Sequence, residues 1–370
     1  MKHRPLLPSL LLATLLAASV GLASAQSARV TVATGLNAPM GLHVSADGAL
    51  YLVEAGYGGD EVLRMIPPGA GEAQDLPFGP TSRLLRLDPS GGGDATEVAV
   101  FPSVHMGMDV SGASRVVTHD GAYFVTSGAW LETDGESPPE WVAEVVRVDG
   151  ASGALATVSD TWALERDENP DGHILESHPF GLTVGPDGML YVADAGANVL
   201  LRIDPSSGAT EIVAVFADGV PGFVPNAQRG GATENDPVPT AVVFAPNGDL
   251  LVSFLPGFPP LPGTGQVVRV ADDGTYQTVA DGSVMLTDLT VGPDGAVYAI
   301  RMADFGEQGP QPMTGAIVRM EDGGFVEVVG ELSFPTAVAF DASGAAYVTL
   351  NGVGAPGSGE VVRFDGVATN

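Results

Sequence analysis

The sequence contains no cysteine, so it can form no disulfide, no thiolate metal site and no cysteine nucleophile. Basic residues are also scarce: the sequence has 15 Lys and Arg but 45 Asp and Glu. Loss of the N-terminal segment described below would remove Lys2 and Arg4, which leaves 13 arginines, no lysine and a formal charge of −32. This charge repels phosphate backbones and anionic lipids, and therefore argues against nucleic acid and membrane surfaces as partners. It favours solubility and attracts divalent cations.

Several sequence motifs are missing as well. The chain has no G-x-S-x-G, no G-x-x-x-x-G-K and no G-x-G-x-x-G between a strand and a helix, so phosphate chemistry and dinucleotide binding have no support. It has no H-E-x-x-H and no other histidine spacing typical of zinc sites. No long stretch combines a helical period with an apolar face, and this absence points away from helical folds.

The N-terminus has the pattern of a secretory signal. Lys2, His3 and Arg4 precede an apolar run at residues 6–22, and an Ala-Ser-Ala cleavage site follows at residues 23–25. We expect cleavage after Ala25 and export to the periplasm or the extracellular space, with an uncleaved membrane anchor as the alternative. No later segment is long and apolar enough to span a bilayer. Residues 26–366 are expected to form one domain, and residues 367–370 a short tail.

The stretch at residues 179–204, PFGLTVGPDGMLYVADAGANVLLRID, predicts three short strands joined by tight turns. The Pro-Asp-Gly sequence at residues 186–188 suits a turn, because proline presets φ and glycine accepts positive φ. A fourth strand is expected at residues 211–216. Strands and turns at this density are typical of an antiparallel meander.

The first two strands of this stretch and their turn recur along the chain. The copies lie at residues 41–54, 241–254, 288–301 and 337–350, with a weaker copy at residues 114–127. The four-strand unit of about 45–50 residues is the repeat of a β-propeller. Six copies predict an all-β protein, a six-bladed β-propeller of four-stranded antiparallel blades. We expect it to be a monomer.

The last copy ends at residues 359–364, one strand short of a full blade. An isolated strand at residues 29–33 precedes the first copy. We predict that this N-terminal strand joins the last blade and closes the ring, which removes an exposed edge.

The inserted segments are all expected on one face. In a meander, the chain leaves the second strand and enters the first strand at the same end of the sheet. The insertions of this kind are residues 57–82, 130–141, 162–178, 218–239 and 255–264. Long loops on one face of a rigid scaffold are the usual place for binding.

Three carboxylates are candidate metal ligands near the mouth of the central channel. Asp288 occupies a position that is small in the other copies, where the inner strands crowd the axis. Glu54 and Asp194 align with each other at the end of a second strand. If the three converge, their oxygens suit Ca²⁺, which could polarise an ester or lactone carbonyl. The alternatives are an inter-blade hydrogen-bond acceptor for Asp288 and turn caps for the other two.

A second acidic candidate is the loop that contains Asp167, Asn169 and Asp171, a D-x-N-x-D-G string. Oxygens at alternate positions before a glycine match the start of an EF-hand Ca²⁺ loop. The match then fails, because His178 stands where the bidentate glutamate would be. A solvated acidic loop is the alternative.

Six further residues are candidate ligand contacts on the loop-rich face. His178 could act as an acid–base group at the channel mouth, and the tryptophans could stack on a sugar or an apolar ligand. Packed histidines and tryptophans that anchor their own loops are the alternative interpretations. The six residues are His105, His178, Trp130, Trp141, Trp162 and Arg301.

The run WALERDENPDGHILESHPFGLTVGPDGMLYVADAGANVLLRID resembles the ScyD/ScyE family of exported propeller proteins. So do the segments VPTAVVFAPNGDLLVSFLPGFP, LTDLTVGPDGAVYAIRMAD and GEVVRF. The likeness covers nearly the whole chain after the signal. It implies export and a six-bladed propeller related to NHL-repeat and gluconolactonase-type proteins, and it implies no reaction. The chain departs from the family pattern at Ser253, Phe254 and Leu255, where an acidic strand end is more typical, which weakens a metal site shared across blades.

Two functions follow from these observations. The first is a binding scaffold for a small molecule, a glycan or a protein on the loop-rich face. The second is a Ca²⁺-dependent lactonase or esterase that uses Glu54, Asp194 and Asp288. Three acidic residues without a matching pair of asparagines are few for such an enzyme, so binding is favoured. Quinone-dependent sugar oxidation is a third, more remote alternative, since Arg301 is the sole basic residue expected at the channel mouth.

Overall fold

The computed structural model describes residues 28–67, 70–107, 109–226 and 229–369. The predicted signal peptide, residues 1–25, lies outside the described residues. Almost all regular structure in the described part is β-strand, as the repeats predict. Six sheets have four or more strands, and, β1 aside, the strands of each follow chain order from the inner strand outward.

The first three sheets come from the N-terminal half of the chain. The first sheet contains β2 (Pro39–Val44), β3 (Leu50–Glu54), β5 (Gln74–Leu87), β6 (Thr96–His105) and β7 (Val110–Ser111), with β4 (Glu61–Met65) paired to β5. The second contains β8 (Ala113–His119), β9 (Ala122–Ser127), β11 (Glu144–Val148) and β12 (Leu155–Asp160). The third contains β14 (Pro179–Val184), β15 (Leu190–Asp194), β16 (Val199–Ile203) and β17 (Thr210–Val215).

The other three sheets complete the ring. The fourth contains β20 (Pro239–Phe244), β21 (Leu250–Phe254), β22 (Gly265–Val270) and β23 (Tyr276–Ser283). The fifth contains β24 (Leu286–Val291), β25 (Val297–Arg301), β28 (Gly315–Glu321) and β29 (Gly324–Leu332). The sixth contains β30 (Val338–Phe340), β31 (Ala346–Leu350), β32 (Gly359–Phe364) and, as its outer strand, β1 (Arg29–Leu36).

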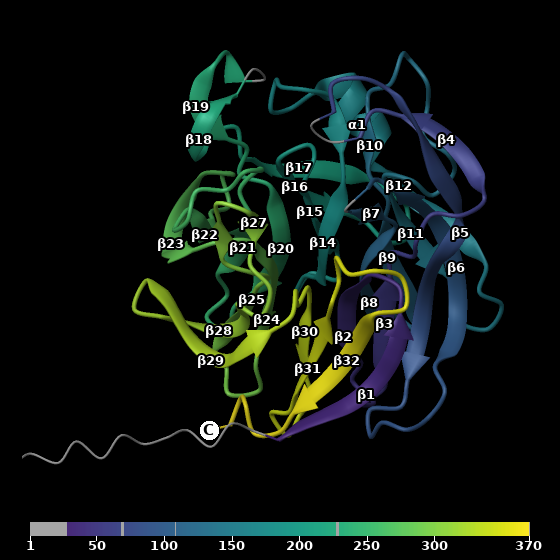
Figure 1. The fold of residues 1–370 in the computed structure, drawn as a ribbon, viewed down its shortest axis with the longest axis vertical. Coiled ribbons are helices and arrows are strands. Elements are labelled where there is room, and N and C mark those ends of the chain that lie inside the picture. Colours follow the sequence, from purple (N-terminus) through teal and green to yellow (C-terminus); the bar gives the residue numbers. More distant parts are fainter. Residues whose placement is uncertain (1–27, 68–69, 108, 227–228, 370) are drawn as a thin grey trace, which may run out of the picture.

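The inner strands of these sheets surround one axis. Each of β2, β8, β14, β20, β24 and β30 contacts the inner strands of the two neighbouring sheets, and β30 contacts β2 to complete the circle (Figure 1). The N-terminal strand β1 lies beside β32, with Arg29 opposite Phe364 and Leu36 opposite Gly359. The architecture is therefore a β-propeller whose ring is closed by its N-terminal strand, as predicted.

The core lies between neighbouring sheets. Strand β3 is buried on both sides, so its sequence is a continuous apolar run rather than an alternating one. Leu50 and Leu52 pack against the sixth sheet, whereas Tyr51 and Val53 point the other way and pack against the second. Because successive side chains of a strand alternate sides, each sheet contributes to two core layers.

The connections carry short elements of their own. They are the β10 (Trp130–Leu131) and β13 (Glu176–Ser177) pair, the β18 (Val220–Asn226) and β19 (Ala232–Asn235) hairpin, the β26 (Phe305–Gly306) and β27 (Gly309–Pro310) pair, and helix α1 (Thr161–Glu168). The sequence shows no long helix, and α1 has only eight residues. Asp160 caps its first turn by accepting a hydrogen bond from the Ala163 amide at 2.8 Å. No helix in the described ranges has the length and apolar character to cross a bilayer.

The expected tail, residues 367–370, begins packed against the sixth sheet. The amides of Val367 and Ala368 each donate to the carbonyl oxygen of Gly344 at 3.0 Å, and Ala368 is buried.

Strands β14 and β20 approach each other so closely at Gly181 that a side chain there would clash. A Cβ at Gly181 of β14 would lie 2.7 Å from the Ala241 Cα and 2.9 Å from the Thr240 carbonyl oxygen of β20. Gly181→Ala is expected to lower the free energy of unfolding by about 1–3 kcal/mol, because two backbones must move apart. Urea unfolding measures this change. Gly324→Ala on outer strand β29, where a Cβ meets nothing closer than 3.9 Å, should show no loss; an equal loss there would contradict the steric argument.

Candidate functional site

The inserted elements share one end of the propeller. Antiparallel strands alternate in direction, so the links from second to third strand and from one sheet to the next leave at the end where the inner strands begin. Helix α1, the three short strand pairs and β4 all belong to such links. We call this end the insertion face and the opposite end the turn face.

Arg115 of β8 lies buried at the centre of the ring, where it lines the central cavity. Its Nη1 donates to the carbonyl oxygens of Met40 at 2.6 Å and of Ser114 at 2.9 Å. Its Nη2 donates to the carbonyl oxygens of Thr336, at 3.2 Å, and of Thr287. One buried guanidinium thus joins the backbones of four inner-strand segments at the axis.

Asp288 of β24 faces Arg115 across the axis, with 3.5 Å between its Oδ1 and the arginine Nε. It also accepts from its neighbour Leu289 at 3.0 Å and from Val338 of the sixth sheet at 2.9 Å. Burial raises the pKa of Asp288 above its ordinary value, and the Arg115 charge offsets part of that rise. The Arg115 guanidinium also lies 4.6 Å from the ring centre of Phe180. The carboxylate therefore lies at the axis, with an arginine and a hydrogen bond between sheets as its contacts.

The sequence comparison missed Arg115 because the turn of its repeat is short. Between the paired residues Thr118 and Tyr123 the chain has four residues, whereas between Val44 and Leu50 it has five. When the repeats are aligned on the turn glycine, the residues of β8 are therefore shifted by one position relative to the other inner strands.

Strand register gives the correct equivalence. Arg115 pairs with Thr126 at the position where Asp288 pairs with Ile300 in the fifth sheet. The alignment on glycine puts Ser114 at that position instead. An alignment that uses the paired residues of the two strands, rather than the turn glycine, makes Arg115 equivalent to Asp288.

Glu54 is fully buried at the end of β3 and bound by donors. Its carboxylate accepts from the Asn37 amide at 2.7 Å and from Arg83 at 2.8 Å (Nε) and 2.5 Å (Nη2). Burial raises the pKa of Glu54, and these donors offset part of the rise. The arrangement is that of a structural ion pair between the second and third strands of the first sheet.

Asp194, at the equivalent end of β15, caps the turn that follows it. It accepts from the amides of His178 at 2.6 Å and of Gly196 and Ala197 at 3.1 Å, and from the Ser177 hydroxyl at 2.8 Å. Burial raises the pKa of Asp194, and the four donors counter it. Each of the three expected channel carboxylates thus has its own protein partners. Within the described ranges, no three acidic or histidine side chains are arranged to hold a metal ion.

The D-x-N-x-D-G string is divided between a helix and a buried turn. Asp167 lies exposed in the last turn of α1, and Asn169 ends the helix with φ of 40°. Asp171 is buried and accepts from the His173 amide and the Asn198 side chain, each at 2.9 Å. The loop therefore brings Asp171, but not Asp167, toward the turn that Asp194 caps.

The tryptophans are packing residues of the insertion loops. Trp130 and Trp162 are buried in one apolar cluster with Met65 and Leu76 of the first insertion. Trp141 is half-buried against the core between the first two sheets. Large apolar rings are the natural anchors for long loops that lack a core of their own.

The histidines differ in environment. His105 ends β6 and is partly exposed. His178 lies against Phe180, with 5.2 Å between ring centres and the rings perpendicular. Burial lowers the pKa of His178 to about 4, and the nearby Arg115 charge contributes. Its ring is therefore neutral at pH 7.

Arg301, at the end of β25, is occupied by acidic partners of the fifth sheet. Its Nη2 lies 2.8 Å from Glu327, and its Nε lies 3.5 Å from Asp304. It also donates to the Thr314 carbonyl at 3.1 Å. These contacts turn its charge toward the sheet edge.

Two cavities are hollowed on the turn-face side. The central one, about 370 Å³, is lined by the later halves of the six inner strands and ends at Arg115 and Asp288. His43 lines it, with its Nε2 2.9 Å from the Thr118 hydroxyl, and burial lowers the pKa of His43 to about 4. The cavity is walled mainly by aliphatic side chains.

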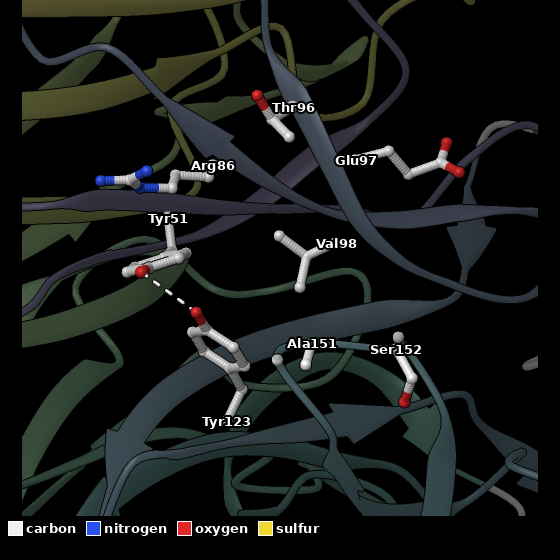
Figure 2. Close-up of a pocket in the computed structure, with 10 residues that line it drawn as sticks. Tyr51, Arg86, Thr96, Glu97, Val98, Tyr123, Ala151 and Ser152 are labelled. Carbon is white, nitrogen blue, oxygen red and sulfur yellow. Dashed lines mark hydrogen bonds between the residues drawn. The ribbon is translucent and has the colours of Figure 1, made fainter.

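The second cavity, about 410 Å³, is a groove between the first and second sheets. Tyr51 and Tyr123 face each other across it, with their hydroxyl oxygens 3.1 Å apart (Figure 2). Burial and this hydrogen bond raise the pKa of Tyr51 to about 12. The Tyr51 phenol therefore stays protonated at neutral pH.

Large hydrophobic side chains are exposed chiefly on the insertion face. Of eight such side chains in the described ranges, six belong to inserted segments, and the other two, Val326 and Val328, lie on outer strand β29. The six are Tyr57, Val62, Phe223, Val224, Phe258 and Met313.

Part of this set is gathered over the fourth and fifth sheets. Gly222 of β18 forms a bridge with Pro260, which holds the β18–β19 hairpin against the loop that carries Phe258. Phe258 is 67% exposed. Its ring lies edge-on to that of Phe305, with 5.1 Å between the ring centres. We call Phe223, Phe258 and Phe305 the aromatic patch.

Comparison with known proteins gives structural matches only. No protein-family model matches the sequence, and no curated protein matches it. Among solved structures, the chain is similar to a putative oxidoreductase (glucose dehydrogenase) from Thermus thermophilus, with 17% identity, a TM-score of 0.53, and coverage of 91% of this chain and 99% of that one. The PQQ-bound aldose sugar dehydrogenase from Streptomyces coelicolor shares 15% identity and a TM-score of 0.52, with 92% and 98% covered. A putative gluconolactonase shares 13% identity and a TM-score of 0.51, with 92% and 93% covered. At these identities the similarity shows the fold alone, and the chain has the β-propeller fold of these proteins.

Proposed function

We propose that the protein is an exported binding scaffold that holds an apolar ligand on its insertion face. The observation that supports this proposal is the placement of the exposed hydrophobic side chains, six of eight of which lie on inserted segments. In a chain with a formal charge of −30, apolar side chains collected at one face are typical of an interaction site. The rigid ring beneath them positions loops, as in other loop-built binding sites.

The aromatic patch is the best-defined part of this surface. Phe258 and Phe305 come from different sheets, and the β18–β19 hairpin adds Phe223 beside them. Asn235 fixes the Phe258 loop by donating to the carbonyls of Gly257 at 2.7 Å and Pro259 at 2.8 Å. A fixed aromatic surface favours an apolar small molecule or an apolar segment of a protein over a charged ligand.

The contacts of the channel carboxylates favour binding over the lactonase alternative. A catalytic Ca²⁺ would need free oxygens at the channel mouth, but Glu54 and Asp288 face arginines and Asp194 has four donors. The ScyD/ScyE resemblance supports export and adds no reaction. Calcium catalysis thus has weaker support than binding.

Binding of the neutral dye Nile red tests the proposal. We expect its fluorescence to rise with the wild-type protein and to fall at least about twofold when Phe223 and Phe258 are both replaced by serine, because these changes remove much of the exposed apolar area. The matched control replaces Val326 and Val328 by serine, which removes exposed apolar groups away from the insertion face. Equal losses in both variants, or none, would contradict an insertion-face site.

Hydrolysis assays test the alternative. A panel of lactones and esters, with and without a chelator, should show rates equal to the buffer blank. Chelator-sensitive hydrolysis that Asp288→Asn or Asp194→Asn abolishes would replace the binding proposal with the enzymatic one.

A further inference from the structure

Glu165 is a buried acid whose carboxylate makes no hydrogen bond of normal geometry. It is 0% exposed on the inner side of α1, and neither carboxylate oxygen has a partner that meets hydrogen-bond geometry. Burial raises the pKa of Glu165 to about 8, with repulsion from Asp194 and Asp171 adding to the rise and the Glu176 amide offsetting part of it. A bare buried carboxylate is costly unless it is protonated or paired with a cation.

Three other acidic residues lie near Glu165. Asp171 follows the helix, Glu176 lies on β13 and Asp194 ends β15. Burial and the charges of Asp194, Asp236 and Asp171 raise the pKa of Glu176 to about 7. In the described part of the chain, no arginine or histidine forms an ion pair with Glu165, Asp171, Glu176 or Asp194.

A neutral oxygen lies one helical turn from Glu165. Asn169 caps the C-terminus of α1 in a left-handed conformation, and its backbone amide donates to the Glu165 carbonyl oxygen at 2.8 Å. Its Nδ2 donates to the His173 carbonyl at 3.0 Å, whereas its buried Oδ1 has no partner. The segment therefore holds three unpartnered buried oxygens, two from Glu165 and one from Asn169.

We propose that a divalent cation, Ca²⁺ by its chemistry, binds between Glu165, Asn169 and Glu176. Carboxylate and amide oxygens are the ligands Ca²⁺ prefers, and its irregular coordination tolerates side chains from a helix and a strand with water in the remaining positions. Among the described residues, no three acidic or histidine side chains are placed to hold a metal ion, so binding requires Glu165 and Glu176 to move toward Asn169. Asp171 keeps its donors, the His173 amide and the Asn198 side chain, and Asp194 keeps its amide and hydroxyl donors. Both residues contribute negative charge near the proposed ion. The site does not depend on the aromatic patch or its ligand.

Calcium titration of the chelator-treated wild-type protein tests the site. We expect binding heat in calorimetry and a rise in melting temperature of about 5 °C when free Ca²⁺ is 100 times Kd. Glu165→Gln keeps the side-chain shape and removes the charge, so this variant should lose the rise and remain at least as stable as the calcium-free wild type. Glu176→Gln changes a partly exposed residue and should weaken binding about tenfold.

Asp167→Asn is the matched control. Asp167 is an exposed acid two residues from Glu165, paired with Arg166 at 2.8 Å, and its variant should keep the full calcium response. No heat and no melting shift up to about 10 mM Ca²⁺ would overturn the site and leave Glu165 as a protonated buried acid. Retention of the response in Glu165→Gln and Glu176→Gln, or its loss in Asp167→Asn, would place calcium elsewhere.

Discussion

Replacing Arg115 with methionine is expected to lower the free energy of unfolding by about 3–5 kcal/mol, because it leaves the buried Asp288 charge without its partner. The change also removes the donor shared by the carbonyls of Met40, Ser114 and Thr336 at the axis. Urea unfolding followed by tryptophan fluorescence measures the loss as a lower midpoint at an unchanged slope.

A double-variant cycle separates the charge from the packing. Asp288→Asn in the Arg115→Met background should recover part of the loss, because the uncompensated charge is gone while the carbonyls stay without their donor. An Arg115→Met protein with the wild-type midpoint would show that the axis does not depend on this ion pair.

His43 is expected to make the protein less stable as pH falls from about 6.5 to about 4. Burial lowers the pKa of His43 to about 4, so in this window the unfolded chain takes up a proton that the folded chain refuses. Stability is therefore present above pH 6.5, is lost on acidification, and levels off below about 4. The stability advantage of wild type over His43→Asn should shrink by about 3 kcal/mol across the window.

Urea midpoints at pH 7, 6, 5 and 4 measure this difference. Comparison with the variant cancels the opposing effect of buried carboxylates, whose raised pKa values act in the other direction. Thr118→Val removes the hydroxyl that contacts His43 at 2.9 Å and should cost about 1 kcal/mol at every pH, since burial rather than this bond causes the shift. A wild-type advantage that stays constant with pH would refute the assignment.

The fold could be predicted because the same strand–turn–strand sequence pattern recurs along the chain. Turn sequences such as Pro-Asp-Gly at residues 186–188 fix hairpins, and their recurrence fixes the propeller. The closing strand β1 could also be predicted, because the last copy lacks its outer strand and Arg29–Leu36 pairs with β32. Helix α1 could not, since its main apolar anchor is Trp162 and its stability comes from the cap at Asp160 and from tertiary packing.

The candidate site was less predictable because its chemistry depends on distant partners. The alignment placed Asp288 near the axis, but a turn shorter by one residue hid Arg115 opposite it. Glu165 stands in the polar sequence TWALERDE, and nothing local distinguishes it from the exposed acids around it. Its burial comes from how α1 packs on the insertion face, a tertiary feature that composition and spacing do not record.

The pairing of β1 with β32 also sets an order of events. Arg29 and Glu360, which form an ion pair across the two strands, are 331 residues apart in the chain. A contact of that separation closes a loop over nearly the whole propeller and cannot form before β32 has been synthesised. While the polypeptide emerges from the ribosome, the first strand has to wait for nearly all the others, and the sixth sheet stays open at its edge until then. Pairing of β1 with β32 therefore completes the sixth sheet and joins the two ends of the propeller.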